Sequence, residues 1–142
     1  MTTSAQLTTA GTISASTRRL HRAGSVVAAA AGASVVWLIA SAAGVDFLLS
    51  DSMGAVTISL PIVLVFSTVF GLLGWATLAV LERFTRRSRA VWTTVAATVL
   101  ALSLPPVFLE DATTATKIAL VLVHAAVAAV LIPALRRDAN AR

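Results

Sequence analysis

The chain has 142 residues, of which 58% are hydrophobic and only 12% are charged. A soluble globular domain carries about a quarter charged residues, so this composition predicts that most side chains lie away from water. The absence of cysteine excludes disulfides, thiolate metal sites and thiol catalysis. The net charge of +5 comes from arginine clusters beside apolar runs, a placement that indicates membrane orientation and no nucleic-acid partner.

Residues 1–17 are small, polar and uncharged, and we expect them to form a disordered N-terminal tail. The first apolar run is free of charge over about 21 residues, or about 31 Å of helix, which suffices to cross the hydrocarbon core. It exceeds the 7–15 residues typical of a signal-peptide core, so we favour a retained span over a cleaved signal. Residues 18–138 form one domain with spans at about 23–43, 56–81, 90–109 and 117–135, and residues 139–142 form a C-terminal tail.

These runs are apolar on all sides and about twice as long as the ten-residue strands of a membrane barrel. Since only helices or closed barrels satisfy their backbone inside a bilayer, we predict an all-α fold, a four-helix transmembrane bundle. Pro61 falls in the first turns of the second span, where proline is tolerated. Pro105 and Pro106 are expected to disrupt the last turn of the third span, and Pro133 to help stop the fourth.

The basic residues fall on one side of this topology. Ten arginines lie in three segments: before the first span, in the loop between the second and third spans, and after the fourth span. The loops on the opposite side carry only Lys117. By the positive-inside rule, the N-terminus, the middle loop and the C-terminus are cytoplasmic. We expect a multi-pass protein of the plasma membrane whose acidic loops, with Asp46, Asp51, Glu110 and Asp111, lie outside.

Small residues recur at four-residue spacing, which lets helix backbones approach closely. The strips are Gly24–Ala28–Gly32, Ser67–Gly71 with Gly74 beside it, and Ala125–Ala129–Pro133. The sequence leaves open whether these faces meet within one chain or between chains. Trp37 and Trp92 lie near opposite ends of their spans and fit interfacial aromatic belts, while Trp75 is expected to pack.

Four polar positions are candidates for function. His124 is the ionisable residue deep inside a span, so it could relay protons or bind a ligand, or it could be a neutral ring hydrogen-bonded to a neighbouring helix. Lys117 lies about 10 Å from it and could join Glu110, Asp111 and Asp46 in an outward charged cluster, or pair with a carboxylate at the interface. Glu82, among the arginines of the middle loop, is interpreted as a salt-bridged interface residue that caps this loop.

No catalytic, cofactor-binding or metal-binding pattern appears: the chain has no HExxH, GxSxG or phosphate-loop motif, and no carboxylate pair at one depth. We therefore expect no enzyme and no cofactor. The leading hypothesis is a non-enzymatic structural or accessory component that packs with a second copy or with another membrane protein. The alternative is a small oligomeric transporter or channel that uses His124.

Short segments in order along the chain carry a resemblance. They are Arg18-Arg19-Leu20, Gly44-Val45-Asp46, Gly74-Trp75, Glu82-Arg83, Arg89-Ala90-Val91-Trp92, Thr116-Lys117, His124 and Leu131-Ile132-Pro133. Together they resemble the four-span integral membrane proteins of the domain of unknown function 6069, found mainly in actinobacteria. The resemblance covers residues 18–137 and implies the same topology. It singles out Asp46, Glu82, Lys117 and His124, and it implies no activity.

Overall fold

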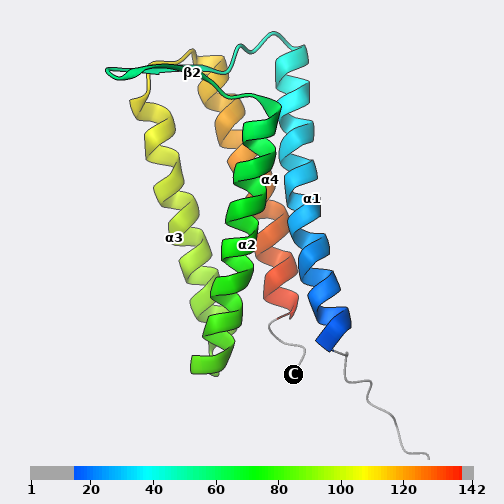
Figure 1. Ribbon diagram of the computed structural model, residues 1–142. Helices are drawn as coiled ribbons and strands as arrows, with labels where there is room; N and C mark the ends of the chain where they lie inside the picture. Colours follow the sequence, from blue (N-terminus) through cyan, green and yellow to red (C-terminus); the bar gives the residue numbers. More distant parts are fainter. Residues whose placement is uncertain (1–14, 139–142) are drawn as a thin grey trace, which may run out of the picture.

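The computed structural model describes residues 15–138, so residues 1–14 of the predicted N-terminal tail and the C-terminal tail at 139–142 lie outside the described part. This part contains four helices and one short hairpin (Figure 1). The elements are α1 (Ala15–Ala42), β1 (Leu48–Asp51), β2 (Gly54–Thr57), α2 (Leu60–Phe84), α3 (Ser88–Leu109) and α4 (Thr114–Asp138). Each helix is long and apolar enough to cross a membrane, which confirms the predicted four-helix transmembrane bundle.

The helices extend beyond the predicted spans because polar residues continue the same hydrogen-bonded turns past the apolar runs. α1 begins at Ala15, inside the predicted tail, and α4 continues past Pro133 to Asp138. α3 also continues through Pro105 and Pro106, so the expected disruption of its last turn is wrong. Membrane helices tolerate such prolines where neighbouring groups satisfy the freed carbonyls.

α2 starts later than predicted, because residues 54–57 belong to a hairpin that the apolar pattern did not indicate. The two strands pair antiparallel from Leu48–Thr57 to Asp51–Gly54. The Asp51 carboxylate accepts hydrogen bonds from the amides of Met53 and Gly54, at 2.7 and 3.0 Å, and so closes the turn. Gly54 has a φ of 145°, a conformation that residues with a Cβ rarely adopt.

The hairpin is attached to the bundle at two points. Ser50 and Asp111 exchange backbone hydrogen bonds of 3.0 and 2.9 Å, which tie β1 to the loop between α3 and α4. Phe47, only 1% exposed, has a left-handed φ of 53° and stacks on Trp37 with ring centroids 5.4 Å apart. The Trp37 indole donates to the Ile58 carbonyl at 2.8 Å. A strained backbone is retained here because the buried ring fixes it.

α1 packs mainly against α4 and α2, while α3 packs against α4 and α2 (Figure 1). The core forms three clusters along the bundle: Val26, Ala29, Leu78, Trp92, Leu131 and Leu135 near the α2–α3 turn; Ala33, Val63 and Val123 in the middle; and Phe47, Val107, Ala119 and Leu120 under the hairpin. Trp92 is 3% exposed and donates to the Gly74 carbonyl at 3.0 Å. It therefore fills the core instead of facing the lipid interface.

The small-residue strips divide between the inside and the outside of the chain. Ser67 and Gly71 of α2 are buried, and a Cβ added to Gly71 would lie 2.9 Å from a methyl of Val26. By contrast, Gly24 and Ala28 of α1 are exposed. Ala125, Ala129 and Pro133 of α4 are exposed as well. Only the α2 strip therefore brings helices of the same chain together.

Candidate functional site

Glu82, near the end of α2, forms a buried ion pair with Arg22 of α1. The Arg22 Nη2 donates to Glu82 Oε1 at 2.7 Å, and Nη1 donates to Oε2 at 3.3 Å. The two side chains are 5% and 12% exposed. A bidentate pair of this kind orients both groups and holds α1 against α2 near the basic end of the bundle.

The partner of Glu82 is not among the arginines that follow it in sequence. Arg83, Arg86 and Arg87 are exposed, and the carboxylate reaches across to a different helix. Arg22 precedes the buried Val26 by four residues, so helical periodicity places it on the packed face of α1. That periodicity was the signal in the sequence for the interhelical pair.

His124 lies half-buried on α4, ten residues and about 15 Å along the axis from the start of that helix. Its Nδ1 is 2.7 Å from the carbonyl oxygen of Leu120 in the same helix. Because a carbonyl can only accept, Nδ1 is the donor of this hydrogen bond, and Nε2 is the ring nitrogen left for another partner. The expected bond to a neighbouring helix is thus replaced by one within α4.

At the hairpin end, a chain of hydroxyls links the first turn of α4 to Asp46. Thr113 caps α4 by accepting from the Thr116 amide at 3.2 Å, and its hydroxyl donates to the Thr116 hydroxyl at 3.0 Å. Thr116 is fully buried and donates to the Asp46 carboxylate at 2.8 Å. Thr116, which was named only in the Thr116-Lys117 segment and not among the four candidate positions, therefore connects the loop after α1 to α4.

The hydrogen bond from Thr116 lowers the pKa of the Asp46 carboxyl below its ordinary value, and the Leu48 amide, which donates at 3.4 Å, adds to the effect. Both donors stabilise the ionised carboxylate. Lys117 does not share this site. Its ammonium group donates to the Phe108 carbonyl at 3.2 Å and forms no ion pair within residues 15–138. The predicted cluster of Lys117 with carboxylates therefore does not form in this part of the chain.

The four predicted positions occupy three depths of the bundle. Glu82 lies near the basic end, His124 in the span, and Asp46 and Lys117 at the hairpin end. Asp46 and Lys117 are related only through the sequence: Thr116, the hydrogen-bond partner of Asp46, is the residue before Lys117. Within the described range, no three His, Asp or Glu side chains gather to hold a metal ion. Glu82, Asp46 and Lys117 each bond to another element, whereas His124 bonds only within α4, so the four positions do not converge on one site in the described range.

The four spanning helices and their apolar surface define a multi-pass integral membrane protein, and this is the class to which the fold assigns the chain. A family model described as a family of unknown function, DUF6069, matches residues 13–141. The chain therefore belongs to this family, as its short segments suggested. No curated protein and no solved structure matches the chain.

Proposed function

We propose that this chain is a non-enzymatic structural or accessory membrane component that binds a second transmembrane helix through the outer face of α1. The partner helix belongs to another copy of the chain or to a different membrane protein. The observation that carries the proposal is the exposed strip of Gly24 and Ala28. Small residues at this spacing allow close helix approach in lipid, where packing drives association.

The glycines of α1 and α2 give an internal comparison. Gly71 has a structural reason within the chain, because a Cβ would lie 2.9 Å from Val26 Cγ1. A Cβ on Gly24 or Gly32 would meet nothing within 4 Å, so packing within this chain does not require glycine there. At 100° per residue, Gly24 lies nearly opposite the buried Val26, so the strip points away from the bundle.

Photocrosslinking in native membranes tests this proposal. The chain has no cysteine, so Ala28→Cys introduces a unique attachment point for a benzophenone probe. Val27→Cys is the matched control, since Val27 is also exposed (68%) but lies about 100° away on the helix. We expect a discrete protein adduct from position 28 and little from position 27. Equal adducts at both positions, or none at either, would contradict the proposed face.

We further propose that the basic end faces the cytoplasm of the plasma membrane. Nine arginines of the described range lie at the end that holds the α2–α3 turn, and the hairpin lies at the other end (Figure 1). The positive-inside rule supports this orientation. An impermeant maleimide should label Met53→Cys in intact cells, because Met53 is 93% exposed at the hairpin tip, and Arg86→Cys only after permeabilisation. The reverse labelling pattern would contradict it.

Transport through an oligomer is the second candidate function. Its support is His124, whose Nε2 forms no hydrogen bond with any group of residues 15–138. A half-buried ring with one open nitrogen could exchange a proton with a ligand or with water. A proton-flux assay on reconstituted vesicles, comparing wild type with His124→Ala, tests this candidate. Flux that depends on His124 would favour transport, and the absence of flux in both proteins would leave the packing role.

A further inference from the structure

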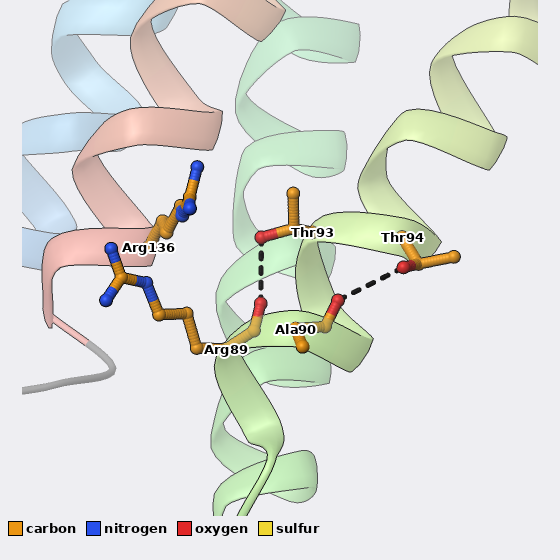
Figure 2. Close-up of a pocket in the computed structure, with 5 residues that line it drawn as sticks. All are labelled: Arg89, Ala90, Thr93, Thr94 and Arg136. Carbon is orange, nitrogen blue, oxygen red and sulfur yellow. Dashed lines mark hydrogen bonds between the residues drawn. The ribbon is translucent and has the colours of Figure 1, made fainter.

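A polar groove opens between α3 and α4 at the basic end of the bundle (Figure 2). Arg89, Ala90, Thr93 and Thr94 of α3 form one wall, and Arg136 of α4 stands on the other. The groove has a volume of about 410 Å³, within the range of about 300–1,000 Å³ usual for ligand sites. None of its lining residues is one of the four positions discussed above.

Both arginines of the groove carry uncompensated charge within the described part of the chain. Neither Arg89 nor Arg136 forms an ion pair there, and the Glu82 carboxylate is engaged by Arg22. The Nε of Arg89 is buried, and no group of residues 15–138 accepts its hydrogen. Two guanidinium groups facing one concavity present the donors that recognise an oxyanion.

The threonines of the groove add no competing donors. The Thr93 hydroxyl donates to the Arg89 carbonyl at 2.8 Å, and the Thr94 hydroxyl donates to the Ala90 carbonyl at 3.2 Å (Figure 2). Their protons are therefore directed to the helix backbone, and the donors left for a ligand are those of the two arginines. This donor set favours an anion with several oxygens, such as a phosphate group.

The surroundings of the groove fit an amphiphile. The groove lies along the first two turns of α3 and the last turn of α4, at the level where a spanning helix meets the lipid headgroups. Farther into the span, Ala97 and Ala101 of α3 are exposed and apolar. We propose that this groove binds the phosphodiester headgroup of an anionic glycerophospholipid, with an acyl chain lying along α3. Arg89 and Arg136 hold the phosphate oxygens.

Native mass spectrometry of the purified full chain in neutral detergent tests the proposal. The probes are phosphatidylglycerol, phosphatidylcholine and inorganic phosphate. The groove variant is Arg89→Gln with Arg136→Gln, and the control variant is Arg86→Gln with Arg137→Gln. The control removes the same charge from two exposed arginines at the same end, outside the groove. Circular dichroism checks that both variants keep their helices.

We expect phosphatidylglycerol to bind the wild type better than phosphatidylcholine does. The groove variant should lose affinity for it by about tenfold or more, and the control by about twofold or less. Equal losses in both variants would reduce the effect to bulk charge and overturn the site. Equal binding of phosphatidylcholine would also overturn it, and displacement by inorganic phosphate at similar concentration would identify free phosphate as the ligand instead of lipid. If the double variant fails to fold, Arg136→Gln against Arg137→Gln makes the same comparison with a smaller expected loss.

Discussion

Replacing Glu82 by glutamine removes the negative charge of the buried pair that joins α1 to α2, so the Arg22 guanidinium loses this carboxylate. The pair has contacts of 2.7 and 3.3 Å, and its side chains are 5% and 12% exposed. Breaking a buried pair by removing one partner costs about 3–5 kcal/mol. Because the second contact is long and the pair lies near the polar end of the bundle, we expect a loss of about 3 kcal/mol, at the lower limit of this range.

Unfolding of the purified protein in mixed micelles, followed by tryptophan fluorescence as the fraction of dodecyl sulfate rises, measures this loss. Asp111→Asn is the control, because it neutralises an exposed carboxylate and should change the free energy of unfolding by less than about 0.5 kcal/mol. The double change Arg22→Leu with Glu82→Leu should recover much of the loss, since no charge then remains buried. Two results would refute this reasoning: a Glu82→Gln protein as stable as wild type, or a double leucine variant that is no more stable than Glu82→Gln.

Three other substitutions have definite expectations. Gly71→Ala places a methyl 2.9 Å from Val26 and should cost about 1–3 kcal/mol in the same unfolding assay. Thr116→Val removes the donor that lowers the pKa of Asp46, so that pKa should rise toward its ordinary value in a carboxyl NMR titration. The stabilisation from this hydrogen bond should be complete above the ordinary aspartate pKa, near 3.9, and should be lost as the pH falls through the lowered value. His124→Ala should lower the free energy of unfolding by about 1 kcal/mol or less, because the ring bonds only its own helix within the described residues. The variant should not show the phenotype of gene deletion.

Two of these expectations have a control variant, and the third has a stated contradicting result. Gly32→Ala adds a methyl that meets nothing within 4 Å, so it should leave stability nearly unchanged, and a loss equal to that of Gly71→Ala would contradict the packing argument. Thr114→Val alters an exposed threonine of the same turn and should leave the Asp46 titration in place. If His124→Ala shows the same phenotype as gene deletion although the protein is present in the membrane at normal abundance, the structural interpretation of His124 is overturned.

The spans were predictable because about twenty consecutive apolar residues have few stable arrangements other than a transmembrane helix. The pairing of side chains between helices was less accessible. Glu82 is surrounded in sequence by Arg83, Arg86 and Arg87, yet the rotation of two helices brings Arg22 to it. Sequence proximity favoured the wrong partners, because interhelical contacts depend on which faces meet.

The hairpin and the small-residue strips show two other limits. The strand pairing depends on the Asp51 turn and on the backbone hydrogen bonds between Ser50 and Asp111. The second contact joins residues far apart in the sequence, so the local pattern of apolar residues does not predict it. In alanine-rich helices, four-residue spacing of small residues occurs on several faces. The same spacing therefore marks a buried contact at Gly71 and an exposed surface at Gly24.

The most direct test of the proposed packing role is the subunit number of the tagged chain extracted in native lipid particles, determined by mass for wild type and Ala28→Leu. We expect wild type in a complex with at least one further chain, and we expect Ala28→Leu as a folded single chain, since the added bulk lies outside the bundle. A wild-type chain found alone, or a complex that Ala28→Leu leaves intact, would contradict the proposal that the outer face of α1 binds a second helix.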